Sequence, residues 1–151
     1  MISNSLKQET VSDGITKYLS DVGVRVIFGV ISIHNMPILD AIARQNIIRF
    51  VPTRGEAGAI NMADAYSRVS GNLGVCITST GTAAGNAAGS QLEALTAESR
   101  LSHITTQIDT KFLDGNSSTI HSVPNQPDML KSISKAYFFI NNPKTAIETL
   151  S

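Results

Sequence analysis

The apolar residues of the chain switch repeatedly between a helical period and a strand period, and this alternation limits the possible folds more than any other feature. Helical stripes cover residues 11–22, 36–46, 55–70 and 128–135, and short β-branched or apolar runs cover 24–28, 47–51, 75–78, 101–107 and 136–140. Strands that alternate with helices at this spacing favour a parallel sheet with helices on both faces. We therefore predict an α/β fold: a three-layer, doubly wound domain with a central, mainly parallel sheet.

Helix ends are also marked in the sequence. Thr10 and Asp13 have the spacing of an N-cap and its reciprocal partner, and Gly23 follows at a typical helix stop. Asn35 precedes Met36-Pro37 and is expected to cap the second helix, which Asn46 can end. A further partial helix is expected after the proline at 143.

Length, charge and cysteine content narrow the class of protein. The 151 residues, 42% of them hydrophobic, predict one domain over 1–151 with a core that needs no metal or disulfide. Twelve basic and twelve acidic residues give no net charge, which argues against nucleic acid or an anionic membrane as partner. Cys76 is the single cysteine, and no apolar run is long enough for a membrane span or a signal peptide. The expected location is the cytoplasm.

Three junctions between a strand and a helix are candidate ligand sites, because open α/β sheets bind ligands beyond the carboxyl ends of their strands. The junctions are residues 29–35, 53–58 and 78–86. In the second, Glu56 follows a strand and precedes an apolar helix. A helix N-terminus favours its charged form and an apolar wall favours its neutral form, which suits acid–base chemistry. A glutamate in the first turn is also common for dipole reasons alone.

The third junction is rich in glycine and other small residues. Backbone N–H groups there could hold a phosphate, but the Walker lysine and a complete G-x-G-x-x-G are missing, so close packing against another subunit is the better interpretation. The three histidines are far apart and lack metal-ligand spacing, so no metal site is predicted. His103 falls in a predicted strand and is expected to be structural, whereas His34 and His121 fall in loops and face either a ligand or solvent.

Several segments in this order resemble a known family. They read GVRVIFGV, TRGEAGAINMADAYSRVSG, LGVCITSTGTAAGN and HSVPNQPDMLKSISKA. The stretch 23–135 resembles the N-terminal, pyrimidine-binding (PYR) domain of thiamine-diphosphate-dependent enzymes, in the acetolactate synthase and benzaldehyde lyase branch. The second segment is the most specific, because nine residues fall in the family's order and spacing: Thr53, Arg54, Glu56, Gly58, Ala63, Asp64, Tyr66, Arg68 and Gly71.

The resemblance implies roles for individual residues. Glu56 matches the activating glutamate, whose carboxyl group hydrogen-bonds N1′ of the cofactor's aminopyrimidine and so promotes attack on a small 2-oxo acid. The other positions implied to contact the cofactor are Gly29, Thr80, Gly81 and Asn86. The positions implied to lie in the substrate cleft are His34, Gln107, His121 and Gln126.

Some positions depart from the family pattern. The glycine-rich loop after the first strand is here the bulkier Val30-Ile31-Ser32-Ile33, Gly55 and Ala57 flank the glutamate in place of the usual His and Gln, and Thr106 replaces a glycine. These changes bear on substrate preference and on activity.

The family's diphosphate site is expected to be missing. In the family a further domain holds the diphosphate through Mg²⁺ with a GDG motif and a later pair of asparagines. Leu113 stands where the first glycine would precede Asp114-Gly115, so we expect no magnesium ligand in this chain. The resemblance implies that the cofactor is shared across an interface, either of a homodimer or with a partner subunit or domain that carries the diphosphate site.

Two hypotheses from different classes follow. The first is a PYR domain or subunit of a thiamine-diphosphate-dependent 2-oxo-acid decarboxylase or carboligase, not active as this chain alone. The second is a catalytically inactive interaction module that kept the fold. A flavodoxin-like nucleotide binder is a third reading, which no aromatic or acidic pattern supports.

Overall fold

A four-stranded parallel sheet forms the centre of the molecule. The computed structural model describes residues 9–113 and 119–151. Strands β1 (Val26–Gly29), β2 (Arg49–Pro52), β3 (Gly74–Ile77) and β4 (Leu101–Ile104) lie in the order β2-β1-β3-β4, and every pair is parallel. The chain therefore winds first to one side of β1 and then to the other. This confirms the predicted doubly wound α/β sheet.

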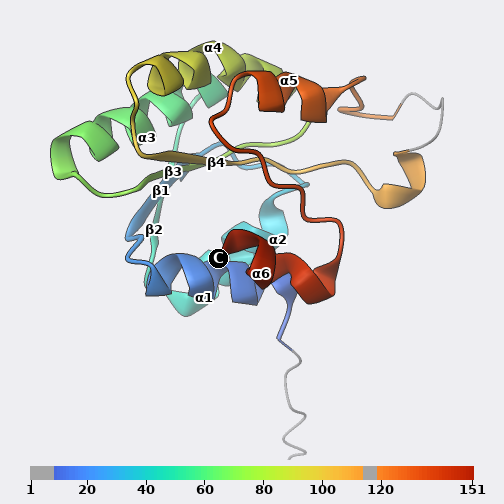
Figure 1. Cartoon of the computed structure of the whole chain (residues 1–151). Coiled ribbons are helices and arrows are strands. Elements are labelled where there is room, and N and C mark those ends of the chain that lie inside the picture. The colour runs from blue at the N-terminus through green and yellow to red at the C-terminus, as the bar shows by residue number, and fades with distance from the viewer. Residues whose placement is uncertain (1–8, 114–118) are drawn as a thin grey trace, which may run out of the picture.

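Helices cover both faces of this sheet, as Figure 1 shows. Helices α1 (Val11–Asp21), α2 (Met36–Gln45) and α6 (Ala146–Leu150) lie below it, and α3 (Glu56–Ser70), α4 (Thr82–Thr96) and α5 (Gln126–Ser132) lie above it. Two short 3₁₀ helices, η1 (Thr110–Phe112) and η2 (Pro143–Thr145), lie in connections. One apolar cluster fills each interlayer space. The lower contains Ile15, Leu19, Ile27, Ile42 and Val75, and the upper contains Phe28, Ala59, Ile60, Ala63, Cys76 and Ala87.

Helix α3 lies unusually close to the sheet at Gly74. A Cβ atom at that position would stand 2.1 Å from the carbonyl oxygen of Ala63, so only glycine permits this approach. On the same strand, burial raises the pKa of the Cys76 thiol, which stays protonated and packs as a small apolar group. The close seating of α3 sets where its first residue, Glu56, lies relative to the strand ends.

The helix ends marked by Thr10 with Asp13 and by Asn46 are confirmed, the cap expected at Asn35 is wrong, and the helix predicted over 128–135 is α5 over Gln126–Ser132. Thr10 and Asp13 form a capping box at the start of α1, and Asn46 ends α2 in the left-handed conformation. Asn35 precedes α2, but its side chain makes no cap bond. It accepts from the Ser32 N–H at 2.9 Å and donates to the Val30 carbonyl at 2.9 Å. The buried amide therefore shapes the loop before the helix rather than the helix itself.

The strand predicted at residues 136–140 is wrong. Those residues belong to no helix or strand and pair with none of the four strands of the sheet. Phe138 is 68% exposed and Phe139 45%, so the apolar run does not mark a buried strand. Its composition is β-favouring, but without burial against a neighbouring strand that preference has no packing to support it.

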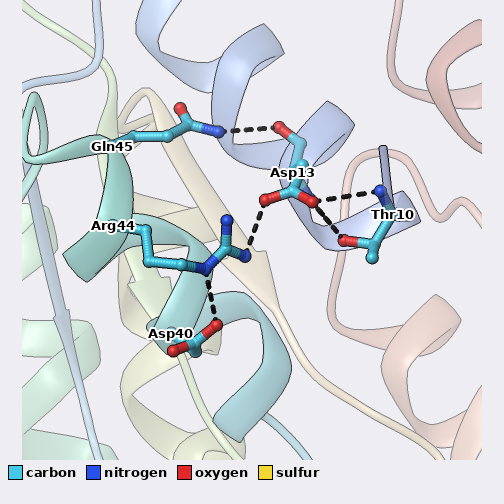
Figure 2. A network of polar contacts seen from close by, with 5 residues as sticks. All are labelled: Thr10, Asp13, Asp40, Arg44 and Gln45. Atoms are coloured by element: carbon cyan, nitrogen blue, oxygen red, sulfur yellow. Dashed lines mark hydrogen bonds and ion pairs between the residues drawn. The ribbon is translucent and has the colours of Figure 1, made fainter. Parts of the chain in front are cut away.

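A polar network joins α1 to α2 on the lower face (Figure 2). The Asp13 carboxylate accepts from the Thr10 N–H at 3.0 Å and pairs with the Arg44 guanidinium at 2.6 Å, which also binds Asp40 at 2.7 Å. Gln45 donates to the Asp13 carbonyl at 3.0 Å. Hydrogen bonds from Thr10, followed by the contact with Arg44, lower the pKa of Asp13 to about 2.

Replacing Asp13 with Asn should therefore destabilise the fold in a pH-dependent way. The carboxylate contributes its full stabilisation above its unperturbed pKa of 3.8 and loses it as the pH falls toward about 2. We expect a lower urea midpoint for Asp13→Asn at pH 7 and a gap to the wild type that narrows between pH 4 and pH 2. The control is Asp21→Asn, which removes an exposed pair with Lys17 on the same helix and should change the midpoint little. A gap that is constant over this range would contradict the assignment.

Candidate functional site

The candidate residues gather at the edge of the sheet formed by the carboxyl ends of the strands. Gly29 is the last residue of β1, and Glu56 opens α3 shortly after β2. The four residues that follow β3, from Thr78 to Gly81, form a turn into α4, which we call the β3–α4 turn. Gln107 lies three residues after β4. Because β1 and β3 are neighbours whose chain connections leave in opposite directions, the candidates surround the switch point of the sheet.

Glu56 and Asn86 are brought together from α3 and α4. The Asn86 amide donates to Glu56 Oε2 at 3.3 Å, and in the described ranges no cationic side chain pairs with this carboxylate. The residue before it, Gly55, has extended backbone, and its carbonyl accepts from the Thr53 hydroxyl at 3.0 Å. The carboxylate is half-buried at the first turn of α3 and retains an oxygen that can accept from, or share a proton with, a ligand.

The Gln126 side chain fastens the β3–α4 turn to α5. Its Oε1 accepts from the Thr80 hydroxyl at 2.8 Å and from the Gly81 N–H, and its Nε2 donates to the Thr106 carbonyl at 3.1 Å. Gln107 Oε1 lies 3.2 Å from the same Thr80 hydroxyl and accepts from the Ile108 N–H at 2.9 Å. Gln126 and Thr80 are buried, so in this structure their polar atoms bind the protein. Their contacts with substrate and cofactor remain predictions.

His34 and His121, far apart in sequence, meet edge to face beside this turn. Their ring centroids are 5.6 Å apart at an interplanar angle of 84°. The backbone of His121 lies against Gly81, where a Cβ would stand 2.1 Å from the His121 carbonyl oxygen, and Gly81 has a φ of +66°. His34 Nε2 is shielded from solvent and has no hydrogen-bond partner within residues 9–113 and 119–151. The pair therefore borders the site and presents a ring nitrogen that a ligand could bind.

Gly29 contributes to the wall of the site through its small size. A Cβ there would stand 2.4 Å from the Ile77 carbonyl oxygen on β3. The Gly29 carbonyl accepts from the Thr53 N–H at 2.8 Å, which aligns the segment that leads into Glu56. The predicted contact of Gly29 with the cofactor is not tested by these distances.

Sequence reasoning missed several residues that shape the site. Thr105 donates to the Ser79 carbonyl at 2.6 Å, and Asn35 holds the loop that carries His34. Ser79 Oγ and Thr106 Oγ1 are shielded from solvent and find no hydrogen-bond partner in the part of the chain that the structure describes. A signal existed for Gln91, a polar residue on the buried stripe of α4 formed by Ala84, Ala87 and Ala94. No pattern in a single sequence marks the others.

The described part of the chain holds no group of three or more His, Cys, Asp or Glu residues that could bind a metal ion. Leu113 is described, but Asp114 and Gly115, the segment compared with the GDG motif, lie outside the described residues. Within the described ranges, no helix has the length and hydropathy of a membrane span.

The fold and the position of its carboxylate define a class: a doubly wound α/β domain that presents a glutamate at the switch point of its sheet. Residues 9–132 match the family described as "Thiamine pyrophosphate enzyme, N-terminal TPP binding domain". The chain belongs to this family, whose thiamine pyrophosphate is the cofactor also called thiamine diphosphate. The resemblance to a PYR domain of the acetolactate synthase branch is thereby confirmed.

Full-length enzymes are among the relatives. The chain is 38% identical over 82 residues to "Probable 2-ketoarginine decarboxylase AruI" of Pseudomonas aeruginosa, which covers 54% of this chain and 14% of that protein. It is 34% identical over 82 residues to "Acetolactate synthase" of Mycobacterium bovis, covering 54% and 13%. It is 31% identical over 102 residues to "Probable acetolactate synthase large subunit" of Methanocaldococcus jannaschii, covering 68% and 17%. The matches thus span 13–17% of the length of these relatives.

Replacing Gln126 with Leu should destabilise the fold, because it leaves the Gly81 N–H and the Thr106 carbonyl without their partner and leaves the Thr80 hydroxyl with the longer contact to Gln107 Oε1 at 3.2 Å. Each unsatisfied buried polar group costs about 1–3 kcal/mol, so we expect a loss of about 2 kcal/mol or more in the free energy of unfolding. Gln107→Leu is the matched control and should cost below about 1 kcal/mol, since it is only half-buried. Urea unfolding measures both. Equal losses for the two variants would show that Gln126 does not fasten the turn.

Proposed function

We propose that this chain supplies the activating glutamate of a thiamine-diphosphate-dependent 2-oxo-acid decarboxylase or carboligase. The observation that carries the proposal is the Glu56 carboxylate, at the first turn of α3 and the switch point of the sheet, with the Asn86 amide at 3.3 Å. A carboxyl group in this place can hydrogen-bond a ring nitrogen of the aminopyrimidine and exchange a proton with it. Membership of the family and the relatives' names support the assignment.

The residues at the strand ends fit an aminopyrimidine. When bound, thiamine diphosphate supplies a carbon nucleophile and takes up the electrons released on decarboxylation. Glu56 would bind the ring nitrogen, and Asn86 would hold the carboxylate in place. The unpartnered hydroxyls of Ser79 and Thr106 are available to a polar ligand, and the turn of Thr80 and Gly81 would lie along one side. His34 and His121, with Gln107 and Gln126 behind them, would border the substrate.

The diphosphate and its Mg²⁺ would be held outside this domain of 1–151, by a further domain or by another subunit. The exposed face of α3 and α4 is suited to such a partner. Gly58, Gly85 and Gly89 have no atom near the place of a Cβ, and the exposed apolar side chains Met62 and Leu92 lie on the same two helices. Small residues allow another backbone to approach closely. We propose that a second copy or a partner subunit packs there, in a cytoplasmic assembly.

A catalytically inactive interaction module remains the second candidate. Ile31 and Ile33 are 60% and 74% exposed in the loop that is glycine-rich in the family, so bulky side chains stand at the border of the site. They would narrow the approach to Glu56 without affecting an interface on α3 and α4. The following experiment separates the two candidates.

Replacing Glu56 with Gln in the complete assembly should slow hydrogen–deuterium exchange at C2 of bound thiamine diphosphate by about a hundredfold or more, because an amide cannot transfer the proton. NMR of quenched samples measures the exchange. Glu148→Gln, an exposed glutamate on α6 at the opposite face, is the control and should exchange as the wild type does. Equal rates for Glu56→Gln and the wild type would refute the proposed role. Slow exchange in the wild type itself would favour the inactive module.

Replacing Met62 with Lys should weaken the assembly while leaving the fold intact. Met62 is 41% exposed on α3, so a charge there costs little in the isolated chain but would be desolvated in an interface. Sedimentation equilibrium, with the chain alone and mixed with the partner subunit, should give a complex for the wild type and mainly single chains of 16.1 kDa for the variant. Val22→Lys, on the opposite face, is the control. If both variants assemble as the wild type does, the α3–α4 face is not the interface.

A further inference from the structure

A series of partly buried hydrogen bonds links the β3–α4 turn to the far end of α5. Thr78 Oγ1 lies 2.7 Å from His103 Nε2 on β4, and His103 Nδ1 lies 2.7 Å from Gln91 Oε1 on α4. Gln91 Nε2 donates to Ser134 Oγ at 2.7 Å, and the Ser134 hydroxyl donates to the Leu130 carbonyl at 2.6 Å. Four segments that are distant in sequence are joined through side chains alone.

The position of each hydrogen along this series of hydrogen bonds follows from the bond at its Ser134 end. Because the Ser134 hydroxyl donates to a carbonyl, it must accept from Gln91, so the Gln91 nitrogen faces Ser134 and its oxygen faces His103. An amide oxygen only accepts, so His103 carries a hydrogen on Nδ1. In the neutral ring Nε2 is then an acceptor, and the Thr78 hydroxyl donates to it. Burial lowers the pKa of His103 to about 4, so the ring is neutral at pH 7.

These bonds reach the same four-residue turn that the Gln126 side chain contacts. Thr78 is held by His103, the Ser79 carbonyl by Thr105, and Thr80 and Gly81 by Gln126. The two amides lie at opposite ends of α5: Gln126 is its first residue, and Gln91 reaches Ser134, two residues beyond its last. The short helix is thus connected to the turn at both ends.

We propose that His103 is a positioning residue for the β3–α4 turn and acts through Thr78, as the counterpart of Gln126 at the other end of the turn. The neutral ring with hydrogen on Nδ1 makes the Thr78 hydroxyl a donor to Nε2 and so turns its hydrogen away from the Ser79 carbonyl, which lies 3.2 Å from Thr78 Oγ1; Thr105 is then the donor to that carbonyl. His103 has this positioning role in the chain by itself. Only the identity of the ligand that the turn contacts rests on the proposed function. Both ring nitrogens of His103 bond to protein side chains, so its effect on the turn passes through Thr78.

The tautomer is the first measurement. Nitrogen-15 NMR of the full chain at pH 7 should show His103 as a single neutral tautomer with hydrogen on Nδ1, whereas the exposed His121 should show averaged tautomers. In Gln91→Leu the His103 signals should move toward averaging, because the partner of Nδ1 is gone. A His103 ring with hydrogen on Nε2, or signals unchanged in Gln91→Leu, would overturn the proposal.

The second measurement separates positioning from stability. The double variant Gln91→Leu/His103→Phe replaces both polar partners with apolar side chains, and the buried Thr78 hydroxyl that loses His103 can donate to the Ser79 carbonyl at 3.2 Å, so the urea midpoint should stay near the wild type. Amide exchange of Thr80 and Gly81 should nevertheless become about fivefold faster, as expected for one lost hydrogen bond. Unchanged exchange at the turn in a folded double variant would refute the positioning role.

Ser134→Ala provides a milder variant that keeps the ring and the amide. It should speed exchange at the turn in the same direction, while Ser132→Ala should not, although Ser132 donates to a carbonyl of the same helix end. Equal effects of the two serine variants would contradict the proposal. Because the chain is measured without cofactor, these results do not depend on C2 exchange, and failure of the proposed function would leave them unchanged.

Discussion

The pairing of β1 with β3 is the constraint on which the site depends. Phe28 pairs with Cys76 and Gly29 with Ile77, so the two strands end side by side although 48 positions separate each pair. Gly29 makes this possible because a side chain there would overlap the Ile77 carbonyl oxygen. With these ends together, the loops after β1, β2, β3 and β4 meet at one edge. The candidate residues lie in these loops, at the strand end that precedes them (Gly29) or in the first turns of the helices that follow them (Glu56, Asn86 and Gln126).

The site combines one accessible carboxylate, that of Glu56, with a rigidly held turn opposite it. Among the described residues, Glu56 has the Asn86 amide as its one side-chain partner, whereas the turn opposite is held at each of its four residues. This division has a chemical reason. A group that must exchange a proton with a ligand needs a free lone pair, while a surface that places a ring within hydrogen-bonding distance must not move. The two requirements are met by different strands of one sheet.

The sequence predicted the layers, the four strands and Glu56, because each leaves a local signal in periodicity or motif. It did not predict that Gln126 and His103 hold the same turn, because that depends on partners 45 and 25 residues away. The strand predicted at 136–140 failed for a related reason. Apolar alternation records the preference of a segment, but a strand also needs a neighbour, and Phe138 remains exposed.

The fastening of α5 at both ends bears on the order of folding. A seven-residue helix is too short to be stable by itself, and its bonds to the turn close loops of about forty residues. By contrast, α3 packs against α4 and against β3, the strand that follows it in sequence. We therefore expect the sheet and these two helices to form first and α5 to join last. Newly made molecules would pass through a stage in which the carboxylate is in place before the opposite wall of its site exists.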